Sequence, residues 1–334
     1  MITKEISFII PVFNRPEEIR ELLQSFCQLE GDKDFEIVII EDGSTIPSEK
    51  EVGEFSDRLN ISYYTKPNSG PGDSRNFGMR HAKGDYFIIL DSDCLLPPNY
   101  LVEVIDELNG EFVHCFGGPD TAHESFSSIQ KAINFSMTSW LTTGGIRGRR
   151  SQIHKFQPRS FNMGLSKEAF KASGGFGKIH PGEDPDLSIR LVDLGYNTRL
   201  FPDAFVYHKR RISWGKFFKQ VYKFGMVRVI LNRWHPGSKR LFYWFPTVFT
   251  LGLILAILLM FVGYFELLYF YGLYFLLIFL VSWSLNRSIV VGISSVFAVI
   301  VQFLGYGYGF LRSQLKLFHS KLPEDQLFPE LFFK

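Results

Sequence analysis

The sequence predicts an α/β domain with a mostly parallel sheet, followed by a helical membrane region. Two observations predict this organisation. Short apolar runs alternate with helical patterns over residues 1 to about 117, and almost all strongly apolar sequence lies after residue 240. Such alternation is typical of a parallel sheet with crossover helices. The chain has 334 residues, of which 46% are hydrophobic and 21% charged, which suffices for a real core and excludes a disordered protein.

The first part of the chain is expected to contain five strands and three helices. One helix is expected from Pro16, a residue suited to a first helical position, to Phe26. Further helices are expected from about Gly72 to Ala82 and from near Pro98. In such sheets ligands bind beyond the carboxyl ends of the strands. The expected strands are Glu5–Val12, Phe35–Glu41, Ile61–Thr65, Tyr86–Leu90 and Phe112–Phe116.

Residues 241–334 are expected to form a membrane region with two to three transmembrane helices. The apolar runs lie at about 244–263, 267–285 and 288–311, and a helix needs about 20 residues to cross the hydrocarbon layer. Three crossings would place the later basic residues outside, against the positive-inside tendency, so a re-entrant or flat third segment is an alternative. A buried helical hairpin in a soluble protein is a further alternative that the length of the runs disfavours.

Residues 209–240 form a basic segment before the first apolar run. They include ten Lys or Arg and no Asp or Glu, although the whole chain has a net charge of only +2. Basic residues beside a membrane span are retained in the cytoplasm and attract anionic headgroups. Interleaved aromatic residues and lysines predict an amphipathic helix in the headgroup region. We therefore expect membrane lipids as partners, and no nucleic acid.

The cysteine pattern and the first residues bear on the compartment. Cys27, Cys94 and Cys115 lie far apart without CxxC spacing, which predicts neither a disulfide framework nor a zinc site. The first residues run directly into a strand-like segment that contains Glu5, so we expect no signal peptide. The expectation is an integral protein of the cell membrane whose α/β part is cytoplasmic.

Acidic clusters follow two of the predicted strands. Glu41-Asp42-Gly43-Ser44 comes after one apolar run and Asp91-Ser92-Asp93 after another. Mg²⁺ and Mn²⁺ prefer oxygen ligands and combine one or two carboxylates with substrate phosphates. Two aspartates at i and i+2 can point the same way, so one can hold a metal while the other meets ribose or sugar hydroxyls. Each cluster alone also fits an ordinary turn.

Five motifs occur in a characteristic order: Pro11-Val12-Phe13-Asn14, Glu41-Asp42-Gly43-Ser44, Ser74-Arg75-Asn76-Phe77-Gly78, Leu90-Asp91-Ser92-Asp93 and Gly182-Glu183-Asp184. The set resembles the family-two glycosyltransferases of the GT-A fold over about residues 5–208. The resemblance implies a catalytic domain at 1–208, with a Rossmann-like, mixed, mostly parallel sheet flanked by helices. It also implies a nucleotide-diphosphate-sugar donor and a divalent cation, Mn²⁺ or Mg²⁺.

The resemblance implies roles for residues around the donor. Asp42 would contact the base or ribose, with Pro11 and Asn14 lining that pocket, and Arg75 would reach the base or diphosphate. The family more often has Asp at the position of Glu41, which weakens a role for that position and leaves Asp42 unaffected.

Within the Asp91-Ser92-Asp93 triplet, the resemblance assigns Asp91 and Ser92 to the donor and Asp93 to the metal. His208 would be a second contact for the metal or diphosphate, as a His is at a similar place in some GT-A enzymes. A lone His is also often structural.

Asp184 would be the general base, although its place before Pro185 and an apolar helical face also fits a helix N-cap. Glu183 and the stretch Asn162-Met163-Gly164 would line the sugar or acceptor pocket, the latter being otherwise an ordinary turn. A basic stretch with Arg147, Arg149, Arg150, His154 and Lys155 is expected to be a mobile loop near the membrane that closes over the diphosphate or meets a lipid-linked phosphate acceptor. A merely solvated basic loop is an equal alternative.

Three functions are compatible with these features. The first is a metal-dependent, inverting glycosyltransferase at the cytoplasmic membrane face that uses a glycan or lipid-linked acceptor of the cell envelope. The second is a polyprenyl-phosphate glycosyltransferase, whose ionised phosphate nucleophile needs no strong base. The third, of another class, is a nucleotide-binding membrane transport or scaffold protein.

Overall fold

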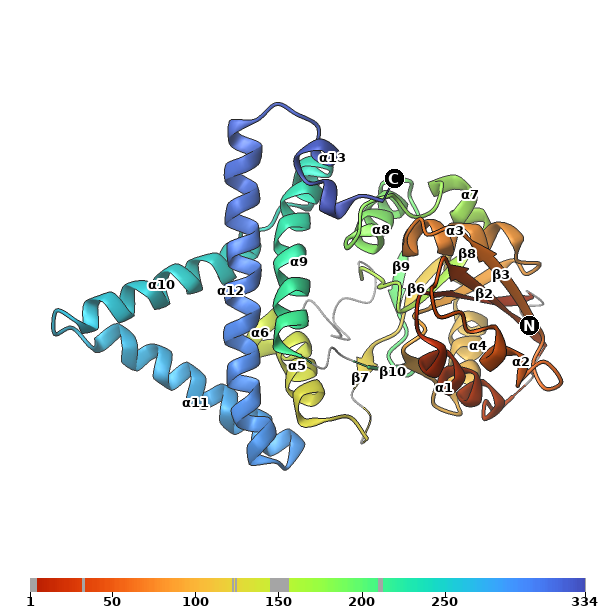
Figure 1. Ribbon diagram of the computed structural model, residues 1–334, viewed down its shortest axis with the longest axis horizontal. Helices are drawn as coiled ribbons and strands as arrows, with labels where there is room; N and C mark the ends of the chain where they lie inside the picture. Colours follow the sequence, from red (N-terminus) through yellow and green to blue (C-terminus); the bar gives the residue numbers. More distant parts are fainter. Residues whose placement is uncertain are drawn as a thin grey trace. The chain divides into compact units, whose positions relative to one another are not determined.

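The computed structural model describes residues 5–31, 34–121, 123, 125–144, 156–209 and 213–333. These residues form two compact units (Figure 1). Unit 1 comprises the described residues of Met1–His123, Gly148–Lys209 and Phe332–Lys334, and unit 2 those of Glu124–Arg147 and Arg210–Leu331. The basic stretch expected at 147–155 lies outside the described residues.

Unit 1 is built on a seven-stranded sheet with the order β3-β2-β1-β4-β8-β6-β9. The four strands β3, β2, β1 and β4 are parallel, whereas β8 is antiparallel to both β4 and β6. A smaller sheet has the order β5-β10-β7. The strands are β1 Ile6–Val12, β2 Phe35–Asp42, β3 Ile61–Lys66, β4 Tyr86–Leu90, β5 Cys94–Leu95, β6 Cys115–Gly117, β7 Asp120–Thr121, β8 Asn162–Ser166, β9 Thr198–Leu200 and β10 Val206–His208.

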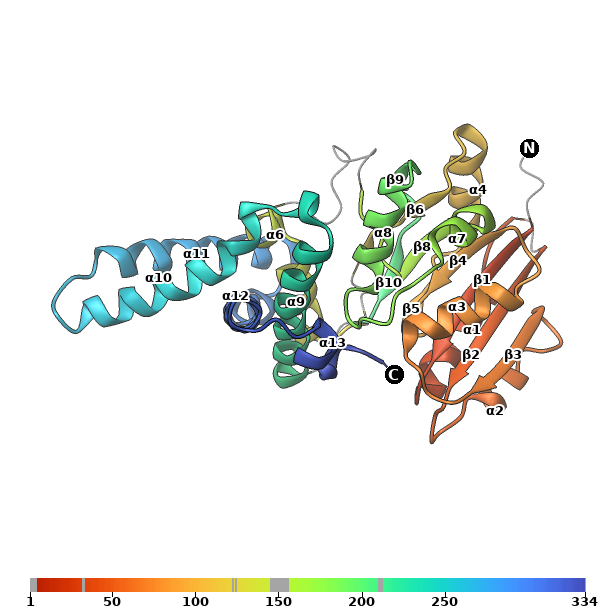
Figure 2. The ribbon, with the colours of Figure 1, turned by 90° about the horizontal axis from the view of Figure 1, so that it is seen from above.

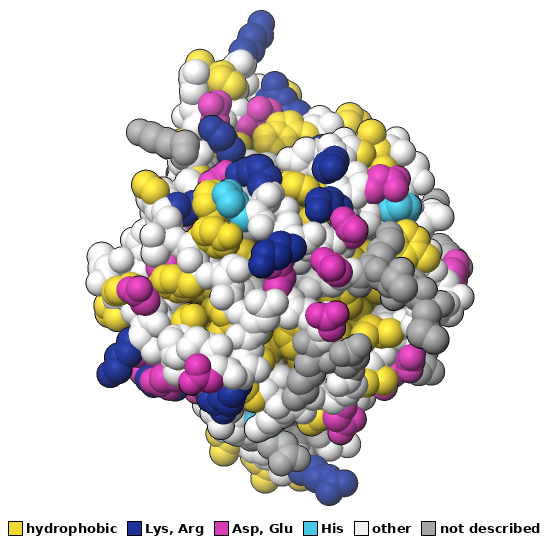
Figure 3. All heavy atoms as spheres, turned by 90° about the vertical axis from the view of Figure 1, so that its right-hand side faces the viewer, with side chains coloured by type: hydrophobic (Ala, Val, Ile, Leu, Met, Phe, Trp, Pro, Cys, Tyr) yellow, Lys and Arg dark blue, Asp and Glu magenta, His cyan; other side chains and the backbone are white. Residues whose placement is uncertain are grey.

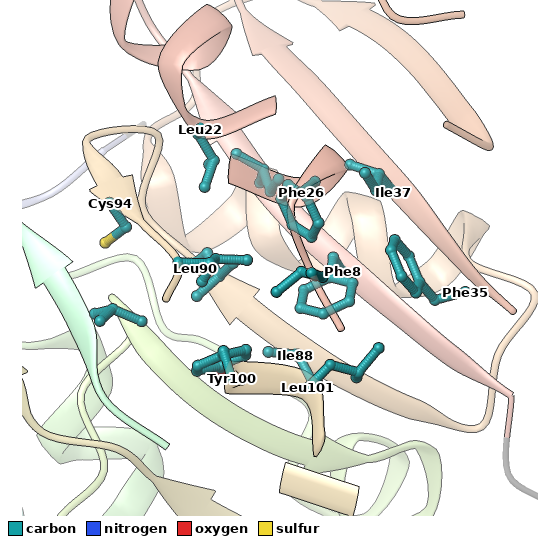
Figure 4. Packing of buried hydrophobic residues seen from close by; sticks show 14 of the residues in the cluster. Phe8, Leu22, Phe26, Phe35, Ile37, Ile88, Leu90, Cys94, Tyr100 and Leu101 are labelled. Atoms are coloured by element: carbon teal, nitrogen blue, oxygen red, sulfur yellow. The ribbon is translucent and has the colours of Figure 1, made fainter. Parts of the chain in front are cut away.

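Apolar clusters cover both faces of the large sheet, because successive strand side chains point to opposite faces. On β1, Phe8 belongs to the cluster that includes helix α1, and Ile9 to the cluster that includes helix α3. Phe8 packs edge-on against Phe26 and Phe35 at ring distances of 4.7 and 5.2 Å (Figure 4). The helices of unit 1 are α1 Pro16–Cys27, α2 Glu49–Gly53, α3 Pro71–His81, α4 Tyr100–Gly110, α7 Lys167–Ser173 and α8 Glu183–Asp193 (Figure 2).

The expected α/β architecture is confirmed. The first four expected strands and the helix from Pro16 appear within a residue of their expected bounds. The fifth is shorter than expected and begins only at Cys115. On one face of unit 1, Lys and Arg side chains are interspersed with Asp and Glu (Figure 3), a mixture typical of solvated domain surfaces.

Unit 2 is helical, and three of its helices are long and apolar enough to cross a membrane: Leu241–Met260, Glu266–Asn286 and Ile289–His319. The third run is one unbroken helix, so its glycines do not interrupt it. The elements are α5 Ser128–Thr138, α6 Trp140–Thr143, α9 Trp214–Trp234, η2 Pro236–Ser238, η3 Leu241–Trp244, α10 Phe245–Met260, α11 Glu266–Asn286, α12 Ile289–His319, α13 Glu324–Leu327 and η4 Pro329–Leu331.

Unit 1 is not one continuous stretch like the domain expected at 1–208, because part of that stretch belongs to unit 2. Helix α5 belongs to unit 2 because it buries Ala132, Ile133 and Met137 against Phe217 of α9 and Ala298 of α12. The basic segment expected at 209–240 does contain a helix, α9. One face of that helix is packed against α12 within unit 2.

Helices α9 and α12 approach each other closely at glycines. A Cβ atom on Gly225 would lie 2.1 Å from the carbonyl oxygen of Tyr306, and one on Gly309 would lie 2.2 Å from that of Tyr222. Backbone atoms cannot move aside without separating the helices. The small residues therefore permit the contact, as is common between membrane helices.

We expect Gly225→Ala to lower the free energy of unfolding by about 1–3 kcal/mol, the usual cost of overpacking. Gly215→Ala is the matched control, because Gly215 lies on the same helix and a Cβ added there would meet nothing within 4 Å. That substitution should be neutral or slightly stabilising, since Ala favours a helix. Thermal unfolding in detergent, followed by tryptophan fluorescence, compares the two proteins. Equal melting temperatures would contradict the close approach.

Candidate active site

Two sheets bring Asp91, Asp93 and His208 together. Asp91 and Asp93 follow the carboxyl end of β4, and the chain then enters β5, where Cys94 is the antiparallel partner of His208 on β10. The Nε2 atom of His208 lies 3.2 Å from Oδ1 of Asp93 and 4.0 Å from Oδ2 of Asp91. The strand pairing therefore places two carboxylates and one imidazole at the same edge of the sheet.

This group fits a hard divalent cation. Ligand atoms of Asp93, Cys94 and His208 all lie within 4.8 Å of one another. Cys94 is fully buried, its thiol donates to the carbonyl of Phe161 at 3.5 Å, and burial followed by the charges of Asp93 and Asp91 raises its pKa well above the usual range. Its sulfur is a soft donor, which hard cations such as Mn²⁺ and Mg²⁺ do not favour. The donor set is therefore carboxylate oxygen and imidazole nitrogen, which suits Mn²⁺ or Mg²⁺ that also binds phosphates.

Arg15 is a site residue that the sequence did not reveal. It lies between β1 and α1, and its Nη1 atom contacts Oδ2 of Asp93. Burial alone would raise the pKa of Asp93, but the charge and hydrogen bond of His208 and those of Arg15 outweigh it and hold this pKa far below its usual range. Asp93 is therefore ionised. The only sequence signal for Arg15 was its place directly after the Pro11–Asn14 motif.

Arg75 joins the β4 end to the start of α8. Its Nη2 atom donates to Oδ1 of Asp91 at 2.7 Å and its Nη1 atom to Oε1 of Glu183 at 2.9 Å. The residue is only 3% exposed and lies 5.3 Å from the ring of Phe176. Both ends of the guanidinium are thus engaged by carboxylates, so Arg75 positions other site residues. The expected contact with a base or diphosphate stays a prediction.

Asp184 does not cap a helix. The N-cap of α8 is Gly182, without a side-chain cap, and Asp184 lies in the first turn. Its side chain is 16% exposed and 3.7 Å from Nη1 of Arg159. Burial is the main cause that raises its pKa; Arg159 opposes this rise, and the charge of Glu183 adds to it. A partly accessible carboxyl group with a raised pKa suits a general base.

Glu183 is held inside unit 1. Its Oε1 atom lies 3.0 Å from Nδ1 of His180 as well as accepting from Arg75. Burial would raise its pKa, but the charge and hydrogen bond of His180, together with the charge of Arg75, lower it. Glu183 is only 3% exposed and its carboxylate contacts Arg75 and His180. The pocket-lining role expected for Glu183 stays a prediction.

Asp42 and Asn14 organise the loops at the ends of β2 and β1. The Asp42 carboxylate accepts from Nζ of Lys66 at 2.6 Å and from the backbone N–H groups of Ser69 and Gly70, both at 3.0 Å. Asn14 has a positive φ of 53°, and its side-chain oxygen accepts from Thr45 N–H at 2.9 Å. Both side chains therefore shape the rim where the donor is expected.

The remaining predicted donor residues lie at the same edge. Pro11 is half-buried near the end of β1, and Ser92 is 6% exposed between the two aspartates. Their contact with the donor stays a prediction.

The expected acceptor contacts at Asn162, Met163 and Gly164 stay a prediction, and the structure places these residues inside the sheet. These residues are part of β8, between β4 and β6, and Asn162 and Met163 are 0% exposed. Asn162 accepts from the Tyr100 hydroxyl at 2.7 Å and donates to the Ala204 carbonyl at 2.8 Å. The Asn162 amide therefore has hydrogen-bond partners within the core, which accounts for an Asn at this buried position.

Comparisons with known proteins agree with this geometry. The chain matches the model of glycosyl transferase family 2 over residues 7–174, which is half of its 334 residues. It is 28% identical over 276 residues to the probable glycosyltransferase YdaM of Bacillus subtilis, covering 73% of this chain and 62% of that protein. It is 26% identical over 241 residues to chondroitin synthase of Escherichia coli, covering 63% and 35%.

A solved structure has a similar fold. The mannosyltransferase PcManGT from Pyrobaculum calidifontis, in complex with GDP-Man and Mn²⁺, superposes with a TM-score of 0.54 at 17% identity, covering 68% of this chain and 64% of that one. The chain spans less than two thirds of the length of these three proteins. The family match, the mixed sheet and the acidic edge of that sheet lead to one conclusion: this chain is a glycosyltransferase of family 2 with the GT-A fold.

Proposed function

We propose that this enzyme transfers a sugar from a nucleoside diphosphate sugar to a hydroxyl group of a glycan or lipid-linked acceptor at the cytoplasmic face of a membrane. The transfer inverts the anomeric carbon and depends on a divalent cation. The observation that carries the proposal is the arrangement around Arg75, which ties the cation-binding edge at Asp91 to the start of α8 at Asp184.

Asp93 and His208 would hold the cation, Mn²⁺ or Mg²⁺, in this proposal. When bound, such an ion neutralises the charge that grows on the departing diphosphate. Asp91, oriented by Arg75, has its other oxygen 4.0 Å from His208 and can accept from a ribose or sugar hydroxyl. Arg15 balances the charge of Asp93.

Asp184 is the proposed general base. It takes the proton from the acceptor hydroxyl while that oxygen forms a bond to the anomeric carbon, and the bond from this carbon to the diphosphate oxygen breaks on the opposite face. One base suffices for inversion, and no carboxylate nucleophile is needed. The raised pKa of Asp184 supports this role, because it makes the carboxylate a better proton acceptor near neutral pH.

The alternatives are less well supported. A polyprenyl phosphate acceptor is already ionised and would not need the raised pKa of Asp184. A transport or scaffold role is disfavoured by membership of a transferase family. The three long apolar helices support an acceptor that is reached at a membrane, and the basic residues at 209–240 support the cytoplasmic face.

Metal-dependent donor binding is expected to require Asp93. In a thermal-shift screen of nucleoside diphosphates with and without Mn²⁺, we expect one diphosphate to stabilise the wild-type protein only when the metal is present. Asp93→Asn should abolish this metal-dependent shift, because it removes the ligand charge. Asp85→Asn is the control, since the Asp85 side chain is 65% exposed and pairs with Lys167 at 3.3 Å. A wild-type shift in Asp93→Asn would refute the assignment.

Asp184→Asn is expected to lower sugar transfer by about 10²–10⁴-fold, the usual contribution of a general base. Asp193→Asn, an exposed position on the same helix, should leave transfer unchanged. Transfer of a radiolabelled sugar to membrane extracts measures both. A rate indifferent to Asp184→Asn would instead favour the phosphate acceptor.

The same variant has an expected stability signature. Because the folded-state pKa of Asp184 is raised, its carboxyl group stabilises the fold only while protonated, and this stabilisation is lost as pH rises through that pKa. Asn imitates the protonated form. The Asp184→Asn protein should therefore melt above the wild type at pH 8, and the difference should shrink toward pH 4. A lower melting temperature at pH 8 would contradict the raised pKa.

Arg75→Ala is expected to destabilise the enzyme by about 3–5 kcal/mol, because it removes the buried cation that pairs with both Glu183 and Asp91 and leaves Glu183 with His180 alone. Adding Glu183→Gln should recover part of this loss, since the buried carboxylate that Arg75 neutralised is then gone. Arg80→Ala provides the control on the same helix, with a side chain 52% exposed. Melting curves of the four proteins measure the effect. If Glu183→Gln deepens the loss in the double variant, the charge argument is wrong.

A further inference from the structure

The chain returns to unit 1 after the membrane helices. Beyond α12 it forms α13 and η4, which are attached to unit 2: Nζ of Lys223 on α9 donates to the Glu330 carbonyl at 3.2 Å, and Lys316 on α12 donates to the Leu327 carbonyl at 3.3 Å. The next residues, Phe332 and Phe333, belong to unit 1. A short segment thus has one end fixed on each unit.

Phe332 and Phe333 pair with the loop that precedes α8. Ile179 and Phe332 form an antiparallel bridge, and the Phe333 N–H donates to the Lys178 carbonyl at 3.1 Å. The loop 178–182 leads directly into Glu183 and Asp184. This β-bridge and this hydrogen bond therefore constrain the loop that leads to Asp184, the proposed base.

The ring of Phe333 packs on Gly70 and also lies near the ring of His180. A Cβ on Gly70 would lie 2.3 Å from a carbon of this ring, so the ring packs directly on the Gly70 backbone. The N–H of Gly70 holds Asp42 at 3.0 Å. On the other side, the ring centroid is 6.0 Å from that of His180, which contacts Glu183. Phe333 thus touches the supports of both Asp42 and Glu183.

The other end of the same loop is held by α3. Asn76 donates to the Phe176 carbonyl and accepts from the Phe176 N–H, both at 2.8 Å. Between this anchor and α8, Gly177 and Gly182 give the backbone little side-chain packing, and Gly182 has a φ of 115°. Within the loop Ile179 is 1% exposed and His180 contacts Glu183, and Phe332–Phe333 add a backbone support at 178–179.

We propose that Phe332–Phe333 act as a clamp that positions Asp184 for proton transfer, which rests on the proposed function. The clamp makes turnover depend on a segment that leaves the membrane-helix unit. Its loss should misplace the base and leave the donor-binding edge at Asp93 and His208 intact. These are positioning residues, since they act through loop 178–182.

The test compares Phe333→Ala with Phe333→Leu in the full chain. Phe333→Ala should lower kcat about tenfold or more, because small displacements of a reacting group are costly. The donor KM should change less than kcat, because Phe333 reaches Asp42 only through the Gly70 backbone. The Mn²⁺-dependent shift by a nucleoside diphosphate should persist, because the proposed cation-binding edge lies on β4, β5 and β10. Phe333→Leu should recover most of kcat because it restores apolar volume over Gly70. Phe318→Ala, at an 85% exposed position, is the control.

Hydrogen exchange supplies a readout that does not need transfer. Phe333→Ala should speed exchange of the amides at 178–183 and leave those of α1 unchanged. Unchanged exchange at 178–183, or a kcat equal to wild type, would overturn the clamp. Loss of the Mn²⁺-dependent shift, or a donor KM that rises as much as kcat falls, would also overturn it, since either result indicates general structural damage. If the wild-type protein transfers no sugar while the exchange result holds, the proposed function fails and the clamp on the loop stands.

Discussion

The buried guanidinium of Arg75 is the interaction on which the site depends. It binds Asp91 at the end of β4 and Glu183 at the start of α8. Arg75 and Glu183 are separated by 108 positions in the chain. Charges with this little exposure are tolerated only when paired, and removal of one partner costs more than the pair contributes. The proposed cation-binding edge and the helix that carries the proposed base are therefore held together by a contact whose loss is strongly destabilising.

Around that contact, two carboxyl groups are driven in opposite directions. Asp93 faces His208 at 3.2 Å and Arg15, so its pKa falls despite burial. Asp184 has Arg159 only at 3.7 Å and the like charge of Glu183 beside it, so burial prevails and its pKa rises. The proposed metal ligand and the proposed proton acceptor are thus the same residue type with pKa values shifted in opposite directions by their environments.

The parts of unit 1 that could be predicted from the sequence are those whose conformation is determined by neighbouring residues. Strands β1 to β4 are apolar runs, and the acidic residues that follow β2 and β4 are turn-forming, so both signals lie within a few residues. Arg15 and the β8 segment depend on partners far along the chain. Asn162 looked like a turn residue, yet Tyr100 and Ala204 satisfy its amide inside the core. The β5–β10 pairing that carries His208 to Asp93 involves only two residues of β5, too short for a periodic signal.

Each unit is built from segments that are separated in the sequence. A segment belongs to the unit in which its apolar side chains are buried. Helix α5, from the middle of the family-2 region, hides Ala132 and Ile133 among α9 and α12. Phe333, which follows α12 in the sequence, packs on Gly70, whose N–H donates to Asp42. A chain cut after residue 208 would expose the apolar face of α5 and uncover Gly70 at once. Neither unit is therefore a contiguous, self-sufficient piece of sequence, and the part of the chain that follows residue 208 contributes to the integrity of the catalytic unit as well as to its anchoring.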